Sequence, residues 1–441
     1  MRCLAVALLA LAPLLGCAQT APGPEAAVAF ENVTVVPMDR ERALPDHTVV
    51  VRGDRIVAVG PSADVDVPEA ATRIDGAGRY LIPGLAEMHG HVPPPSAPAE
   101  LTEETLFLYL SQGITTVRGM LGAPGQLELR ARANAGELLS PTLYLAGPSF
   151  RDQTVSSPEQ AAARVREQAA EGWDLLKVHP GLTRAEYDAL AETAREVGIR
   201  FGGHVPADVG VRHAIAQGQE TFDHVDGYAE ALGASAGPVD EAALAGLVDA
   251  TREAGAWIVP TMALWEVLYG TLPLDTLRAY PELAYVSPEQ RAAWAGRVEA
   301  LRSDGGDAAA AQRLIEGRQR ILAALHAGGA RILMGTDAPQ LYSVPGFSLH
   351  REVPRMAAAG MTPYEILQSG TAHVGAYFAD TDTFGLVAPG HRADLVLLDA
   401  DPLLDAAHLQ QIAGVMVRGR WVPRAEIDAR LEAIRRAYLA P

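Results

Sequence analysis

The chain has 441 residues, of which 49% are hydrophobic and 20% charged, a composition typical of a globular protein with a large core. Its formal net charge is -18, and no cluster of basic residues interleaved with aromatic residues occurs along it. A nucleic-acid partner is therefore not expected.

The N-terminal residues form a positively charged start followed by an apolar run that is too short to span a membrane. This pattern predicts an export signal at residues 1–16. Leu14-Leu15-Gly16-Cys17 resembles a bacterial lipobox, so we expect Cys17 to carry a lipid anchor at the periplasmic side of a bacterial membrane. Ordinary signal cleavage after Ala18 is the alternative. Residues 17–27 would form a tether. Because Cys3 leaves with the signal, an intramolecular disulfide is excluded.

The two flanks of the chain, residues 28–80 and 383–425, contain short β-branched runs separated by turns. Neither flank has enough strands for a stable sheet. We therefore expect both ends to combine into one small β-sandwich domain. Apolar residues at helical spacing, among them Ile427 and Leu431, predict a closing helix at 426–441.

Residues 81–382 alternate predicted strands with helical stretches, several of which begin at capping boxes such as Thr183-Arg-Ala-Glu186. The strands are expected at 81–89, 114–118, 142–146, 174–179, 199–205, 221–225, 257–262 and 331–337. Eight strand–helix units predict an α/β fold, a (β/α)8 TIM barrel. The alternative is an open doubly wound sheet, which is disfavoured because no glycine-rich phosphate-binding segment follows the first strand. The long interval at 263–330 predicts extra helices.

Polar residues with metal-ligand chemistry fall at or near the ends of these strands. His89 and His91 are one residue apart, so both imidazoles can reach one ion from the same face of a strand. Further candidates follow later strands, at the face where barrels build active sites. They are Lys177, His204, His224 and Asp337. Imidazole and carboxylate groups suit zinc or a similar divalent ion.

Lys177 is the unusual member, because an ammonium group would be repelled by metal ions. If its amine reacts with carbon dioxide, the resulting carbamate is an anion that can bridge two metals. An unmodified lysine would instead mean a single ion or a salt bridge.

This set resembles the amidohydrolase superfamily, particularly the binuclear branch of microbial prolidases, carboxypeptidase-like amidohydrolases and ochratoxin-hydrolysing amidases. Pro83-Gly84 and the segment at 385–399 match the family's framing segments, and the resemblance spans residues 28–422. One departure is that Lys177-Val-His-Pro-Gly181 stands where the prolidase-like branch often has Ser-Gly-Gly.

The resemblance implies two divalent metal ions, with zinc expected. One ion would be held by His89, His91, N6-carboxylated Lys177 and Asp337, and the other by the same carbamate with His204 and His224. It also implies that a metal-bridging hydroxide attacks the substrate carbonyl while Asp337, as the catalytic residue, accepts and returns a proton.

Three further residues are candidate substrate contacts. Tyr228 follows His224 and could contact a tetrahedral intermediate, with core packing as the alternative. His350 and Arg351 could bind a substrate carboxylate near the mouth of the barrel, with a salt bridge or helix cap as the alternative.

The leading interpretation is a hydrolase that cleaves the amide C–N bond of a small-molecule substrate such as a dipeptide or an N-acyl amino acid. A cyclic amide or imidazolone hydrolase and a heterocycle deaminase are alternatives, although mononuclear deaminases and imidazolone hydrolases usually lack the lysine of the fourth strand. Lactone hydrolysis and a non-catalytic, lipid-anchored binding protein stay open, and metal content would separate the last from an enzyme. The sequence also allows a homo-oligomer.

Overall fold

The computed structural model describes residues 27–303 and 307–439. The predicted export signal, Cys17 and the tether up to residue 26 lie outside the described residues. Within the described part of the chain, no helix is both long enough and apolar enough to cross a membrane.

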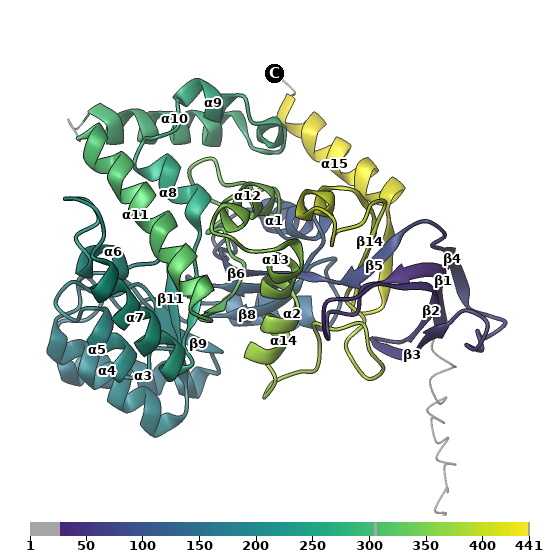
Figure 1. The fold of residues 1–441 in the computed structure, drawn as a ribbon, viewed down its shortest axis with the longest axis horizontal. Helices are drawn as coiled ribbons and strands as arrows, with labels where there is room; N and C mark the ends of the chain where they lie inside the picture. Colours follow the sequence, from purple (N-terminus) through teal and green to yellow (C-terminus); the bar gives the residue numbers. More distant parts are fainter. Residues whose placement is uncertain (1–26, 304–306, 440–441) are drawn as a thin grey trace, which may run out of the picture.

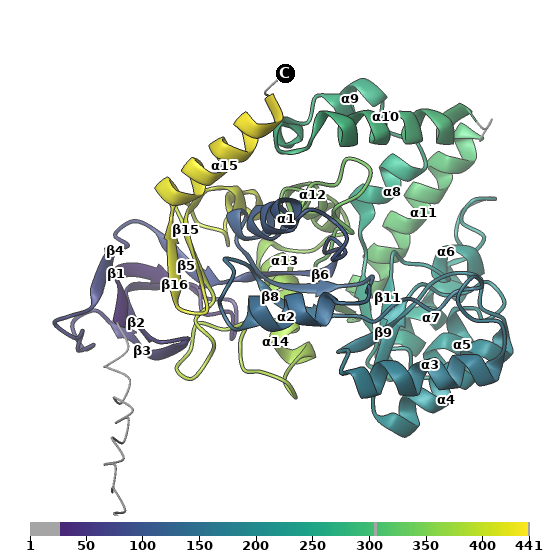
Figure 2. The same cartoon turned by 180° about the vertical axis from the view of Figure 1, so that it is seen from behind.

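Strands from both ends of the chain form one eight-stranded sheet with the order β16-β15-β14-β5-β1-β2-β3, in which β4 pairs with β1 (Figure 1, Figure 2). Its strands are β1 (Ala27–Val35), β2 (Leu44–Arg52), β3 (Arg55–Pro61), β4 (Thr72–Asp75), β5 (Tyr80–Pro83), β14 (Leu395–Leu398), β15 (Ile412–Val417) and β16 (Arg420–Pro423). The two ends meet where β5 pairs antiparallel with β14, with Leu81 opposite Leu397. A sandwich needs a second packed layer, and that part of the expectation stays a prediction.

The middle of the chain forms two parallel sheets. The first contains β6 (Leu85–Gly90), β7 (Ile114–Gly119) and β8 (Thr142–Leu145). The second contains β9 (Leu175–Val178), β10 (Arg200–Gly203), β11 (Thr221–Asp223), β12 (Trp257–Val259) and β13 (Arg331–Ile332). Backbone contacts join the two sheets at both edges. Ala146 bridges to Leu175 at one edge, and at the other the Met88 amide donates to the Met334 carbonyl over 2.9 Å.

Helices follow most of these strands, which confirms the α/β alternation. They are α1 (Ala99–Ser111), α2 (Gln126–Asn134), α3 (Pro158–Glu171), α4 (Arg184–Val197), α5 (Val211–Ala216), α6 (Tyr228–Ala231), α7 (Glu241–Ala254), α8 (Met262–Leu268), α9 (Leu274–Arg278), the 3-10 helix η1 (Pro281–Tyr285), α10 (Pro288–Ser303), α11 (Ala308–Ala327), α12 (Leu349–Ala358), α13 (Pro363–Gly370), α14 (Ala372–Tyr377), the 3-10 helix η2 (Ala406–Gln410) and α15 (Arg424–Leu439). The elements from α8 to α11 occupy the interval where extra helices are predicted. The capping box of Thr183 and Glu186 is present at the start of α4.

Several predicted strands differ from the structure. The strand expected at 257–262 ends at Val259, and α8 begins at Met262. The strand expected at 81–89 is divided, because the Gly84 amide donates to Asp394 of the end sheet whereas the Leu85 amide donates to Gly113 of the parallel sheet. The strand expected at 331–337 ends at Ile332. Beyond it, the Thr336 amide donates to the Glu87 side chain at 2.7 Å rather than to a neighbouring strand.

Candidate metal centre

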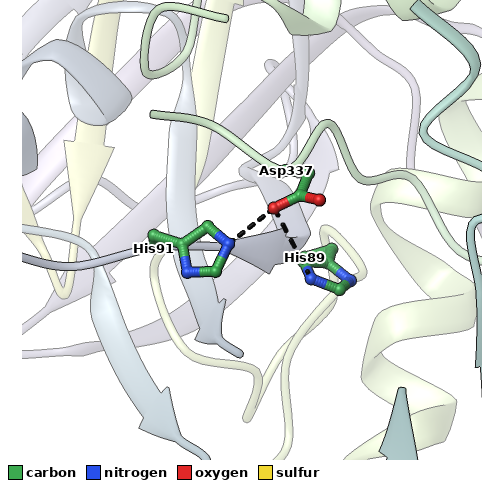
Figure 3. A group of neighbouring side chains, drawn as sticks. All are labelled: His89, His91 and Asp337. Atoms are coloured by element: carbon green, nitrogen blue, oxygen red, sulfur yellow. Dashed lines mark hydrogen bonds and ion pairs between the residues drawn. The ribbon is translucent and has the colours of Figure 1, made fainter. Parts of the chain in front are cut away.

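Three of the predicted ligands form a compact cluster at the end of β6 and the segment that follows β13. Ligand atoms of His89, His91 and Asp337 all lie within 4.8 Å of one another (Figure 3). The Asp337 Oδ1 atom is 2.5 Å from His91 Nε2 and 3.6 Å from His89 Nε2. We call these three residues the metal-ligand cluster.

The other three predicted ligands lie beside this cluster. The Lys177 Nζ atom is 3.1 Å from His89 Nε2. His224 Nε2 is 3.6 Å from Asp337 Oδ2, and the rings of His204 and His224 have centroids 4.5 Å apart. The structure thus brings the whole predicted ligand set together, while their role as ligands stays a prediction.

A partner outside the set stands at the Nδ1 atom of three of the imidazoles. Asp223 Oδ2 lies 2.8 Å from His89 Nδ1, Asp226 Oδ2 lies 2.5 Å from His204 Nδ1, and Thr261 Oγ1 lies 2.7 Å from His224 Nδ1. The last two contacts are hydrogen bonds, which orient the rings of His204 and His224 and leave their Nε2 atoms available as ligand atoms. The first is an ion-pair contact, because neither His89 Nδ1 nor Asp223 Oδ2 has a hydrogen-bond partner among the described residues.

A buried arginine supports each of the two aspartates. Arg118 Nη2 is 3.3 Å from Asp223 Oδ1, and Arg318 Nη2 is 3.2 Å from Asp226 Oδ1. Both arginines are 1% exposed or less, so these ion pairs are shielded from water.

Burial sets the protonation states of the centre. Burial and then the charge of Lys177 hold the pKa of His89 well below its ordinary value, and burial does the same for the pKa of His224. Burial also lowers the pKa of Lys177, against the opposing effect of Asp223. Burial alone would raise the pKa of Asp223, but Arg118 and Lys177 outweigh it and lower this pKa. His89 and His224 are therefore neutral, as metal binding requires.

The centre needs close approaches of the backbone at two glycines. A Cβ atom at Gly203, where φ is +121°, would lie 2.9 Å from the Lys177 side chain and 2.5 Å from the Val178 carbonyl. A Cβ atom at Gly335 would lie 2.9 Å from the His89 amide nitrogen. Only glycine leaves room for the lysine and the histidine at these positions.

Sequence reasoning missed the residues that contact the Nδ1 atoms of the predicted histidine ligands, and Asp223 shows why. Asp223 directly precedes His224, so strand alternation would place their side chains on opposite faces. However, His224 has a φ of 66°, which breaks the strand, and both side chains reach His89. One signal was present: Arg118 is the last residue of the strand predicted at 114–118, and an arginine in a strand that becomes buried needs an anionic partner.

Glu87 is a second residue that sequence reasoning missed. Its buried carboxylate accepts hydrogen bonds from the amides of Thr336 and His89, at 2.7 Å and 3.0 Å. It thereby joins the two segments that carry the metal-ligand cluster. Burial raises the pKa of Glu87 to about 8.

The predicted substrate contacts have protein partners. The Tyr228 hydroxyl is fully buried and bonds with Thr251 Oγ1 at 2.6 Å. His350 Nε2 is 3.0 Å from Gln112 Oε1, and Arg351 Nε donates to Glu282 at 2.7 Å. Their role in substrate binding stays a prediction.

The donor set fits a divalent ion such as zinc. The buried His224 Nε2 atom has no hydrogen-bond partner among the described residues, and it is 3.6 Å from the Asp337 carboxylate. Neutral imidazoles and carboxylates are preferred zinc ligands, and an unpartnered buried nitrogen beside them is the feature that a metal would satisfy.

Comparisons with known proteins agree with this geometry. The model of the Amidohydrolase family matches residues 80–422. Adenine deaminase of Rubrobacter xylanophilus is 25% identical over 415 residues, covering 91% of this chain and 59% of that enzyme. Imidazolonepropionase of Idiomarina loihiensis is 26% identical over 415 residues, covering 88% of this chain and 94% of that enzyme.

A solved Xaa-Pro dipeptidase with methionine bound in its active site has a TM-score of 0.69 at 20% identity, covering 90% of this chain and all of that one. At this identity the likeness shows the fold. The chain spans 33% to 59% of the length of the first adenine deaminases that it matches.

Proposed function

The chain belongs to the amidohydrolase family, and on this premise we propose that it is a metal-dependent hydrolase that cleaves the amide C–N bond of a small molecule, such as a dipeptide or an N-acyl amino acid. The observation that carries the proposal is the metal-ligand cluster, with Lys177, His204 and His224 beside it. The residues at the Nδ1 atoms, Asp223, Asp226 and Thr261, support the proposal, because they direct the imidazoles to a common centre.

Two divalent ions, zinc in the first place, would be held by these residues. His89, His91 and Asp337 would hold one ion, and His204 and His224 the other, with Lys177 shared between them. Bound divalent ions make water acidic enough to supply hydroxide near neutral pH and polarise a carbonyl group.

We propose that Lys177 is N6-carboxylated. Its side chain is fully buried, yet its Nζ atom is 3.1 Å from His89 Nε2 and 3.9 Å from the nearest carboxylate oxygen, on Asp223. An ammonium group there would have Asp223 as its nearest counterion, at 3.9 Å, and Asp223 already pairs with Arg118. A carbamate would place two anionic oxygens at this point and satisfy the surrounding donors.

Asp337 would move the proton. Its Oδ1 atom faces His91 and His89, whereas its Oδ2 atom faces the unpartnered His224 Nε2. We propose that Oδ2 accepts the proton of the attacking water and returns it to the departing amide nitrogen. The Asp337 amide donates a hydrogen bond of 2.7 Å to the His89 carbonyl, which holds the carboxylate in place.

We also propose that the two parallel sheets close into one (β/α)8 barrel and that the end sheet belongs to a small sandwich domain. Support for the barrel comes from the backbone contacts at both edges, between Ala146 and Leu175 and between Met88 and Met334. A barrel would place the ends of its strands, and hence the ligand set, on one rim.

The test begins with protein purified without chelator. We expect about two divalent ions per chain by elemental mass spectrometry, and release of an amine from a panel of dipeptides and N-acyl amino acids. Asp337→Asn should lose turnover while its circular dichroism spectrum is unchanged. Asp275→Asn, at a side chain that is 97% exposed, is the matched control. Near-wild-type turnover by Asp337→Asn would refute the role of Asp337, and protein without metal or turnover would favour a non-catalytic binding protein.

Hydrolysis of a cyclic amide or deamination of a heterocycle is a second candidate, because the matching curated relatives are adenine deaminases and imidazolonepropionases. The same protein is therefore assayed with adenine and with imidazolonepropionate. Turnover of either one, with no turnover of linear amides, would replace the first candidate by the second.

A further inference from the structure

A cavity of about 250 Å³ is lined by residues that follow two of the predicted ligands closely in the chain, although no predicted ligand lines it. Two segments that line it also carry ligands: Pro93 stands two residues after His91, and Pro339 stands two residues after Asp337. Because consecutive Cα atoms are about 3.8 Å apart, each proline lies within about 8 Å of its ligand residue, measured between Cα atoms. Two of the segments that line the cavity are therefore continuous with segments that carry the metal-ligand cluster.

The remaining walls come mainly from four elements distant in sequence, among them η1 with Tyr285. α1 contributes Leu101 and Leu108, α10 contributes Trp294, and the end of α15 contributes Tyr438. Figure 1 and Figure 2 show α10 and the C-terminal end of α15 on the same side of α1, and α15 contacts both α1 and η1. Ring contacts keep this wall in place, since Trp294 packs against Tyr342 with centroids 5.8 Å apart.

The lining is largely apolar, with the polar residues Thr105, Ser287, Gln290 and Gln340, and it offers no positive charge. Among the described residues, no lysine, arginine or histidine lines the cavity. Its one carboxylate, that of Glu104, accepts a hydrogen bond from the Tyr438 hydroxyl. A substrate carboxylate would lose its hydration here without a cationic partner, whereas an uncharged apolar group would gain from burial.

The size of the cavity suits a group larger than a methyl. An apolar cavity of about 150 Å³ in another protein binds benzene, so 250 Å³ accommodates an aromatic ring or a chain of several methylene groups.

We propose that this cavity is the subsite for a large uncharged apolar group of the substrate, an aromatic side chain or a medium-length alkyl chain, that lies a few bonds from the scissile amide. This inference rests on the proposed function and narrows its substrate class. The preferred substrates would be N-acyl amino acids with a long acyl chain, or amides of an aromatic amino acid.

The test compares kcat/KM for N-acetylglycine, N-octanoylglycine and N-acetylphenylalanine. We expect at least one of the two bulky substrates to exceed N-acetylglycine by about tenfold or more, because an apolar pocket discriminates by at least this factor. Leu101→Trp and Gln290→Trp fill the cavity from opposite walls at residues that are already exposed. Each should reduce the preference about tenfold. Leu404→Trp, at a side chain that is 76% exposed and not part of the cavity, should keep it.

A binding measurement on the full chain separates this inference from the proposed function. We expect the fluorine NMR signal of 4-fluorobenzyl alcohol to broaden in the presence of wild type or Leu404→Trp, but not in the presence of Leu101→Trp. If the bulky substrates are not preferred, or if both tryptophan variants keep the preference, the subsite is wrong while the hydrolase stands. If no amide is turned over, the proposed function fails. In that case broadening of the fluorine signal still supports an apolar binding site, and its absence overturns the site.

Discussion

Replacing Thr261 by Val removes one hydroxyl group and tests how the centre is held. Thr261 is fully buried, its hydroxyl does not cap α8, and its oxygen is 2.7 Å from His224 Nδ1. Leaving this nitrogen unpaired costs about 1–3 kcal/mol. Loss of such a partner typically weakens metal binding about 10–100-fold, which corresponds to about 1.4–2.7 kcal/mol and agrees with that penalty. We expect the metal affinity, measured by competition with a chelator, to fall by this factor, and kcat/KM to fall with it at limiting metal.

Thr251→Val is the matched control for Thr261→Val. Thr251 is equally buried, and its hydroxyl bonds with the Tyr228 hydroxyl and the Leu247 carbonyl rather than with a predicted ligand. Both variants should lose comparable stability in urea unfolding, about 1–3 kcal/mol. The reasoning is refuted if Thr261→Val binds metal as tightly as wild type, or if Thr251→Val weakens metal binding equally.

Three further predictions concern modification, packing and pH. Active wild type in ¹³C-bicarbonate should show a carbamate carbon signal that Lys177→Ala lacks, and added propionate should partly restore the activity of this variant; an active enzyme without the signal contradicts the carboxylation. In urea unfolding, Gly203→Ala should lose about 1–3 kcal/mol of unfolding free energy, and it should bind less metal, because the φ of +121° at this position strains any other residue. The control Gly296→Ala, whose Cβ atom would meet nothing within 4 Å, should lose no stability. Burial lowers the pKa of His350 to about 4 from 6.5; the unfolded chain then binds a proton that the folded chain refuses. The free energy of unfolding of wild type should therefore fall relative to that of His350→Asn, by about 3 kcal/mol at most, as the pH falls from about 6.5 to about 4. If urea unfolding gives the same difference between the two proteins at both pH values, the prediction is contradicted.

The sequence predicts the strand–helix alternation and the ligand set because both depend on local patterns. His89 and His91 share a face at the end of β6, and the other predicted ligands lie at or just beyond later strands. The partners of these residues depend instead on contacts between distant segments. Thr261, for example, is an ordinary β-branched residue in the sequence, and only the packing of its segment beside His224 gives its hydroxyl a role.

Strand ends were harder to predict for a related reason. Beyond Ile332 the amides change their partners: the Met334 amide donates to the Ser369 carbonyl and the Thr336 amide to the Glu87 side chain, so the ladder of β13 does not continue. A glutamate within a buried strand has no periodic signature that would announce this change of partners. Likewise, no local sequence pattern shows that the Gly84 amide bonds to Asp394 whereas the next amide, that of Leu85, bonds to Gly113.

The sheet made from both chain ends has a consequence for the order of events during synthesis. β1 to β5 leave the ribosome early, but β5 obtains its neighbour β14 only when nearly the whole polypeptide has been made. Arg79 and Asp399, which are 320 positions apart, form an ion pair across this junction. Until then the edge of β5 is an open template for pairing with other chains. A nascent chain arrested before β14 should thus aggregate or recruit a chaperone at β5, and shielding of that edge would mark the moment when the fold is completed.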